Sequence, residues 1–177
     1  MKRSYIKRNL KKFLAGTLGL LLFLSSSSVV KAATSDQVPL SVDKPGAGYV
    51  NTQSGSLRIR KGPSETAEII GSLPKDSKIM IVERGDKFDK IQYDTSGNYG
   101  YVASSYIKEY DLEYYGTVNT TGTLNIRSGS DISYDVVAYM PSRTKFPILE
   151  IFVGWDYIVY GNVEGYVSSQ YIIRRHY

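Results

Sequence analysis

An eight-residue segment occurs twice in this chain, as GYVASSYI at residues 100–107 and as GYVSSQYI at residues 165–172. Upstream of it, LRIRKG at 57–62 is matched by LNIRSG at 124–129, a spacing of 67 residues. The spacing falls to 65 at the glycines that begin the eight-residue segments, so the first copy has two extra residues near Asp94. A length change confined to one place between matching segments is typical of a hairpin loop. The chain therefore contains a duplicated unit of about sixty residues, and this small size constrains what each copy can fold into.

Each copy shows a hydrophobic period of two, which indicates β-strands. Leu57 to Arg60 alternates strictly between apolar and basic residues, and the alternation returns at residues 124–127. The predicted strands are 57–60, 69–73, 78–83, 88–93 and 99–102 in the first copy, and 124–127, 136–140, 145–151, 155–160 and 165–167 in the second. Glycine, proline and polar residues separate them, as expected for turns. We expect an all-β fold in which each copy is a small, strongly bent barrel, because so few short strands cannot form an ordinary two-sheet sandwich.

Each predicted barrel has one set of apolar residues that faces inward. The first set is Leu57, Ile59, Ile79, Ile81, Ile91 and Val102, and the second is Leu124, Ile126, Phe146, Ile148, Ile158 and Val167. Gly161-Asn162 has the composition of a two-residue hairpin loop. Because each core is small, docking of one barrel on the other is expected to matter for stability.

The first 32 residues have the order of a secretory signal peptide. Six basic residues precede an apolar run from Phe13 to Leu24, and a serine tract then leads to the small residues Ala32 and Ala33. The alternative is an uncleaved membrane anchor, but the apolar run is shorter than the ~20 residues that a spanning helix needs. We therefore expect residues 1–32 to be removed, and no membrane association of the mature protein.

Removal of the signal would change the charge of the protein. The whole chain has a formal net charge of +5, whereas the residues after position 32 carry −2. Nucleic-acid binding thereby loses its main support, since it depends on a basic surface. The chain has no cysteine, so the folded part has to be stable without disulfides, and a lipid cannot be attached through an N-terminal cysteine.

These features divide the chain into five segments. We expect a signal peptide at 1–32, a disordered lead-in at 33–47, a first barrel at 48–110, a linker at 111–115 and a second barrel at 116–177. The linker, DLEYY, lacks glycine and proline and so does not have the composition of a flexible one. We expect at least one of Tyr114 and Tyr115 to be buried between the barrels.

The motifs of each copy, taken in order, resemble those of the bacterial SH3-type domain (SH3b). They are LxIRxG, a turn, an aliphatic strand ending near Leu-Pro or Met-Pro, an aromatic-centred strand and GYV-x-S-x-YI, and together they cover most of residues 48–173. The first copy has Phe88 where the family usually shows Trp, which Trp155 supplies in the second copy. The second copy has Ser130 where the family often has the proline seen at Pro63. The resemblance implies a small β-barrel that serves as a non-catalytic targeting module, commonly attached to enzymes that cut peptidoglycan. Several relatives bind wall peptides or cross-bridges.

The sequence does not support an enzyme. Common wall-lytic enzymes use a Cys/His pair, or a zinc ion held by His and carboxylates. This chain has no cysteine and a single histidine, His176. A glycosidase with two carboxylates needs no histidine, but barrels of this size offer no deep cleft for one. We therefore expect no catalytic residue, no metal and no cofactor.

Candidate ligand-binding residues are polar and aromatic. A tyrosine ring offers flat apolar area and a hydroxyl, which suits a shallow groove for peptides or sugar faces, although tyrosine also packs well on a half-buried sheet. The candidates are Asn51, Thr52, Arg60, Tyr93 and Tyr106 in the first copy, and Asn119, Thr120, Arg127, Trp155, Tyr160 and Tyr171 in the second.

Several of these candidates have a structural alternative. For Arg60 and Arg127 we favour hydrogen bonds to turn carbonyls over pairing with a stem-peptide carboxylate. The Asn-Thr pairs either bond an extended peptide backbone or form a turn. The closing residues 174–176 are expected to form a solvated tail.

Two functional hypotheses follow. The first is a secreted protein, extracellular or associated with the cell wall, whose two SH3b modules bind peptidoglycan through its peptides or cross-bridges. The second is a protein-interaction module that docks or regulates a separate exported partner, such as a wall hydrolase. A stand-alone enzyme is the weakest reading for the reasons above.

The signal assignment predicts where the mature protein begins. If residues 1–32 are cleaved on export, N-terminal sequencing of secreted material should start at or near Ala33. Recovery of the full-length chain in the membrane fraction would contradict this prediction.

Overall fold

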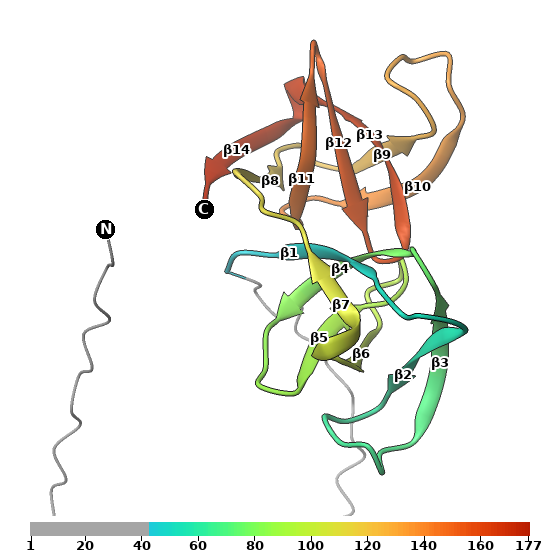
Figure 1. Ribbon diagram of the computed structural model, residues 1–177. Helices are drawn as coiled ribbons and strands as arrows, with labels where there is room; N and C mark the ends of the chain where they lie inside the picture. Colours follow the sequence, from blue (N-terminus) through green and yellow to red (C-terminus); the bar gives the residue numbers. More distant parts are fainter. Residues whose placement is uncertain (1–42) are drawn as a thin grey trace, which may run out of the picture. The chain divides into compact units, whose positions relative to one another are not determined.

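The computed structural model describes residues 43–177, which fall within one compact unit. The expected signal peptide and most of the expected lead-in lie outside the described residues. Within them the regular elements are β-strands and two single turns of 3₁₀ helix, and this part of the chain contains no α-helix (Figure 1). The all-β prediction is confirmed.

The two copies contain the same elements in the same order. The first has β1 (Gly46–Val50), β2 (Ser56–Arg60), β3 (Ile69–Pro74), β4 (Lys78–Glu83), β5 (Phe88–Gln92), β6 (Tyr99–Ala103), η1 (Ser104–Tyr106) and β7 (Ile107–Glu109). The second has β8 (Tyr114–Val118), β9 (Thr123–Arg127), β10 (Val136–Pro141), β11 (Lys145–Phe152), β12 (Trp155–Tyr160), β13 (Val163–Ser168), η2 (Ser169–Tyr171) and β14 (Ile172–His176). All ten predicted strands are present, and β1, β7, β8 and β14 are additional to them.

Each copy forms one antiparallel sheet of seven strands. The order is β3-β2-β6-β5-β4-β1-β7 in the first copy and β10-β9-β13-β12-β11-β8-β14 in the second. The identical order confirms the duplication at the level of topology. The outer strands of each sheet do not pair with each other, so each SH3-like barrel curls without closing.

The curl of each sheet depends on a glycine of the repeated segment. β6 meets β2 at a single register pair, Arg60 with Tyr101, and the second copy repeats this contact. A Cβ atom on the adjacent Gly100 would lie 2.4 Å from Cγ2 of Ile59 and 3.2 Å from the carbonyl oxygen of Arg60. The absence of a side chain therefore allows β6 to cross the end of β2.

The predicted core residues are all buried. The twelve side chains assigned to the two cores have exposed fractions of 5% or less. The first cluster also contains Val50 and Leu73. The second cluster includes Met140 and Val159 and, from the first sheet, Ala47 and Met80. The second core is therefore completed by residues of β1 and β4.

The length difference between the copies lies in one hairpin. β12 and β13 are joined by Gly161-Asn162 alone, and Gly161 has φ 62° as a two-residue hairpin requires. The corresponding loop, between β5 and β6, is longer and is held by Asp94, whose Oδ1 accepts the backbone N–H groups of Ser96 and Asn98 at 3.0 Å. Both hairpin expectations are confirmed.

The first and second sheets contact each other through β4 and the β12–β13 hairpin. The backbone N–H of Met80 donates to the carbonyl of Gly161 at 3.3 Å. Lys78 donates to the carboxylate of Glu164, which also accepts the hydroxyl of Tyr157. The bond to Glu164 raises the pKa of Lys78 to about 12, so this cation stays charged throughout the physiological range.

The boundaries expected for the linker and the lead-in differ from the observed strands. β1 begins at Gly46, two residues before the expected start of the first barrel, and β8 begins at Tyr114 inside the expected linker. Tyr115 is 7% exposed, and its ring contacts Tyr177 with 5.5 Å between ring centroids. The hydroxyl of Tyr177 donates to the carbonyl of Pro45, just before β1. Tyr115 is thus buried as expected, although the ring that it contacts, Tyr177, belongs to its own copy and not to the first barrel.

Residues 174–176 are exposed as expected of a solvated tail, but they do not form a free tail. These residues belong to β14, which pairs with β8. Nε of Arg174 donates to Oδ1 of Asp156 at 2.8 Å, and Nη2 to Oδ2 at 2.9 Å. Asp156 is fully buried, and Ser169 also donates to it at 2.7 Å. The tail is ordered because a buried carboxylate requires a partner that carries positive charge or donates hydrogen bonds.

The glycine contact predicts the effect of adding one methyl group. A Cβ on Gly165 would lie 2.6 Å from the carbonyl oxygen of Arg127, a backbone atom that can only move with its strand. Gly165→Ala should lower the free energy of unfolding by about 1–3 kcal/mol, as overpacking does elsewhere. Urea unfolding measures this change. Gly122→Ala is the matched control, because nothing lies within 4 Å of its Cβ position, and equal losses for both variants would contradict the argument.

Candidate ligand-binding groove

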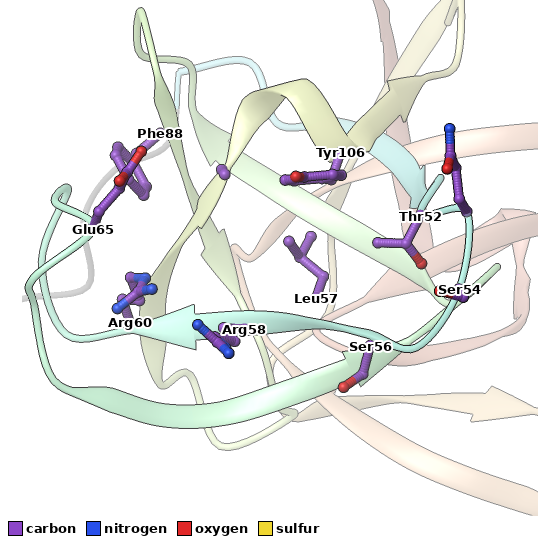
Figure 2. A pocket seen from close by; sticks show the side chains of 11 residues that line it. Thr52, Ser54, Ser56, Leu57, Arg58, Arg60, Glu65, Phe88 and Tyr106 are labelled. Atoms are coloured by element: carbon purple, nitrogen blue, oxygen red, sulfur yellow. The ribbon is translucent and has the colours of Figure 1, made fainter.

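The first copy has an open groove of about 870 Å³ beside β2. Figure 2 shows Tyr106 above Leu57, with Thr52 and Ser54 toward one end and Arg60, Glu65 and Phe88 toward the other. The lining is completed by Gln53, Ser56, Arg58 and Ala103. Three of the predicted binding residues, Thr52, Arg60 and Tyr106, thus come together in one place.

The strand alternation and the 3₁₀ turn position the side chains of this groove. In β2 the apolar residues Leu57 and Ile59 are buried, so Arg58 lies on the opposite, exposed face. η1 presents Tyr106 with 48% of its surface exposed. The backbone N–H of Asn51 donates to the carbonyl of Tyr106 at 2.8 Å, and Asn119 bonds Tyr171 in the same way at 2.8 Å. The segment after β1 therefore holds η1 in place.

The two predicted arginines bond the loop that follows their strand. Nη1 of Arg60 donates to the carbonyl of Ala67 at 2.8 Å, and Nη1 of Arg127 donates to that of Tyr134 at 2.8 Å. This is the structural role that the sequence analysis favoured, and it is confirmed. Arg60 still lines the groove, although one of its donors is occupied by the loop.

The groove combines apolar rings with exposed charges. Tyr106 and the half-buried Phe88 supply aromatic surface, and Leu57 adds an aliphatic contact. Arg58 and Glu65 are exposed, and neither forms a side-chain hydrogen bond or an ion pair with any residue between 43 and 177. Such a surface can pack against a peptide backbone or a sugar face and still offer charges of both signs to a ligand.

The remaining predicted residues of the first copy lie beside the groove or behind it. Asn51 is exposed in the loop after β1, and its observed contact is the backbone bond to Tyr106. Tyr93 is half-buried and packs against the first core. Thr52 is 8% exposed, and its hydroxyl donates to the carbonyl of Gly55 at 3.4 Å, so this residue shapes a turn.

The second copy places its candidates on the corresponding elements. Tyr171 is 45% exposed on η2, Trp155 is half-buried at the start of β12, and Arg127 ends β9. Asn119 is exposed, and the carbonyl of Thr120 accepts the hydroxyl of Ser142. Tyr160 is 4% exposed and packed in the second core, and burial raises its pKa. The ring of Tyr160 is therefore not presented to a ligand in this structure.

Sequence reasoning missed the two free charges of the groove. It selected residues that recur in both copies, whereas Arg58 is matched by Asn125 and Glu65 by Ile132. Arg58 could have been identified from the alternation of β2, because this pattern places residue 58 on the exposed side of the strand.

No group of three or more His, Cys, Asp or Glu residues that could hold a metal ion occurs in the described part of the chain. Over the same residues, no helix is long and apolar enough to span a membrane.

Comparisons with known proteins give one family match. The family model described as "Bacterial SH3 domain" matches residues 55–108 and 122–173, which is more than half of the chain. Each match covers the groove-forming elements of one copy, from the start of β2 or β9 to η1 or η2.

A curated relative matches most of the chain. The chain is 27% identical over 138 residues to the Bacillus subtilis (strain 168) protein named "Putative N-acetylmuramoyl-L-alanine amidase YrvJ", covering 70% of this chain and 26% of that protein. The chain thus spans about a quarter of the length of this relative.

Two solved structures resemble this chain with low sequence identities and low TM-scores. NlpC2 from Trichomonas vaginalis has 17% identity and a TM-score of 0.38, with 75% of this chain and 49% of that chain covered. NlpC1 from the same organism has 18% identity and a TM-score of 0.37, with coverages of 73% and 45%.

The arginine contacts predict which residues stabilise the barrels. Arg60→Ala removes a partly buried charged donor and should lower the free energy of unfolding by about 1–2 kcal/mol. Arg127→Ala should cost about 0.5–1 kcal/mol, because its hydrogen bond is exposed to solvent. Chemical denaturation of the unmodified protein and of the two variants measures both changes in the free energy of unfolding. Arg58→Ala is the control on the same strand, and a loss as large as that of Arg60→Ala would refute this assignment.

Proposed function

The chain belongs to the bacterial SH3 domain family, and from this premise we propose that it is a secreted, non-catalytic protein that binds the bacterial cell wall. Its two SH3b modules would hold peptidoglycan through its peptides or cross-bridges. The observation that carries the proposal is the groove beside β2, whose elements recur in the same order beside β9.

The shape of the groove suits a polymer better than a small substrate. It is open along β2, and its rings lie on a single-turn helix and a strand end rather than at the bottom of a cleft. A flat aromatic surface with polar neighbours can accept an extended peptide or the face of a sugar. An enzyme would need a site that encloses its substrate and excludes water, and we propose that this chain supplies binding alone.

The curated relative supports the wall as the target. Its name refers to N-acetylmuramoyl-L-alanine, the junction between sugar and peptide in peptidoglycan. The match includes only 26% of that protein, so the amidase activity in its name does not transfer to this chain. A match limited to this share of that protein fits a common target better than a common reaction.

We assign the binding roles to the exposed rings and the polar residues around them. Tyr106 and Tyr171 would stack on the ligand, and Phe88 and Trp155 would extend the aromatic surface of each groove. Arg60 and Arg127 would contribute through the donors that remain after their loop bonds.

Two grooves on one chain can bind a repetitive ligand more tightly than a single groove can. When both can engage the same polymer, the second contact is intramolecular, and the overall affinity can exceed that of one groove by ~10²–10⁴. The bonds between β4 and the β12–β13 hairpin favour a fixed relation of the two grooves. A fixed relation loses less entropy on binding than a free linker if its geometry fits the wall.

Retention on purified, protein-free cell walls tests the proposal. The mature chain should be retained, and Tyr106→Ala and Tyr171→Ala should each weaken retention by about tenfold or more because the intramolecular advantage is lost. The double variant should not be retained. Lys61→Ala is the control, since this side chain is 74% exposed and is not among the residues that line the groove.

The same assay separates the second candidate function. No retention of the unmodified chain on walls, together with binding to a purified exported wall hydrolase, would support a docking or regulatory module instead. Retention that survives the double tyrosine variant would place the wall contact outside the grooves and contradict the site assignment.

A further inference from the structure

The elements that form the groove recur in the second copy, but two charged positions of the first copy are neutral there. Arg58 on β2 corresponds to Asn125 on β9, and Glu65 in the loop after β2 corresponds to Ile132. Ile132 is 77% exposed. The first groove therefore carries a cation and an anion where the second carries a neutral amide and an apolar side chain.

These charges make no polar contact with other side chains in the described part of the chain. Within residues 43–177 the side chains of Arg58 and Glu65 make no hydrogen bond and no ion pair, and both are exposed. The neighbouring charges of the same region are engaged, since Arg60 bonds the carbonyl of Ala67 and Lys61 pairs with Glu68 at 3.5 Å. The second copy builds the same sheet order with neutral residues at both positions.

Both free charges line the groove together with its rings. Figure 2 shows Arg58 along β2 and Glu65 at the end near Phe88. A guanidinium can bind a carboxylate with two parallel hydrogen bonds, and a carboxylate accepts hydrogen bonds from an ammonium group. A ligand that carries both a carboxylate and an ammonium group can therefore pair with both residues.

We propose that the first groove binds a peptide segment carrying both a free carboxylate and a free amine, whereas the second groove binds a neutral segment. Arg58 binds the carboxylate, Glu65 binds the ammonium group, and Tyr106 and Phe88 contact the chain between them. The inference rests on the proposed function, because it names the part of a wall peptide that one of its two grooves selects. Arg58 and Glu65 are specificity-determining residues in this assignment, and Asn125 and Ile132 are their neutral counterparts.

The size of the effect follows from the exposure of the two charges. Exposed ion pairs are weak in water and are screened by salt. Among exposed ion pairs, hydrogen-bonded pairs between a guanidinium and a carboxylate are the stronger ones. Loss of either charge should therefore weaken the first groove by about threefold to tenfold, and the loss should shrink as salt is added.

The experiment uses the full mature chain and chemically modified walls. Purified, protein-free walls are used untreated, with carboxylates converted to methylamides, or with free amines acetylated. Tyr171→Ala makes retention depend on the first groove, and Tyr106→Ala makes it depend on the second. In the Tyr171→Ala protein, each wall modification should lower retention by about threefold to tenfold. In the Tyr106→Ala protein, neither should change it.

The second part of the experiment replaces the two charged residues of the first groove by the neutral residues found at the same positions of the second copy. In the Tyr171→Ala protein, R58N should reproduce the loss seen on amidated walls and should make the protein insensitive to amidation. In the same protein, E65I should reproduce the loss seen on acetylated walls and should make the protein insensitive to acetylation. K61S, which copies Ser128 at an exposed cation outside the groove lining, should change nothing. Thermal unfolding of each variant checks that the fold is kept, and the wall modifications test the same contacts without any substitution.

The outcomes separate this inference from the proposed function. Retention that responds neither to wall modification nor to R58N and E65I overturns the charge assignment and leaves wall binding in place. Equal sensitivity of both grooves to amidation overturns the difference between them. No retention of the unmodified chain on any wall overturns the proposed function and this inference with it.

Discussion

The contact of β6 with β2, and of β13 with β9, is the constraint on which the rest of each copy depends. It consists of a single register pair, and a glycine beside it leaves room for a carbonyl oxygen and an isoleucine methyl group of the facing strand. Only with this approach does the sheet curl far enough for its inner face to bury its own apolar residues. The same curl brings η1 over β2, so the groove is a consequence of the way the core is made. The repeated GYV segment is thus the part of the sequence that joins fold and site.

The sequence predicted the parts of this fold that have a strong local signal. Strict alternation marked β2 and β9, and the matched spacing located the one loop that differs in length. β1, β7, β8 and β14 carry glycines, exposed polar residues or too few residues for a period to show, and they are strands because partners far along the chain pair with them. Arg174 was misjudged for the same reason, since a charged residue near a chain end gives no sign of the buried carboxylate 18 positions earlier. Tyr160 shows the limit for the site, because sequence spacing cannot distinguish a ring on the sheet surface from one between two sheets.

The contact between the two copies makes them unequal, because only one of them completes its core with residues of the other. Ala47 and Met80 of the first sheet belong to the second core, while the first core is formed by its own residues. The second copy therefore depends on the first for part of its buried apolar surface, which is expected where a unit of this size has few residues to bury. Lys78, Tyr157 and Glu164 form a hydrogen-bonded group at the same contact. Such a contact stabilises a defined relation between the two copies.

Divergence of the two copies is possible because the strand position that differs, 58 in β2 and 125 in β9, lies on the face opposite the core. In β2 and β9 the buried positions are leucine and isoleucine in both copies, since any change of volume there is felt by the whole core. The position between them faces outward, where an arginine and an asparagine are equally compatible with the sheet. A duplication can therefore keep its fold by retaining the inward residues while the outward ones adapt to different ligands. The exposed charges of the first groove, Arg58 and Glu65, are located where this freedom exists.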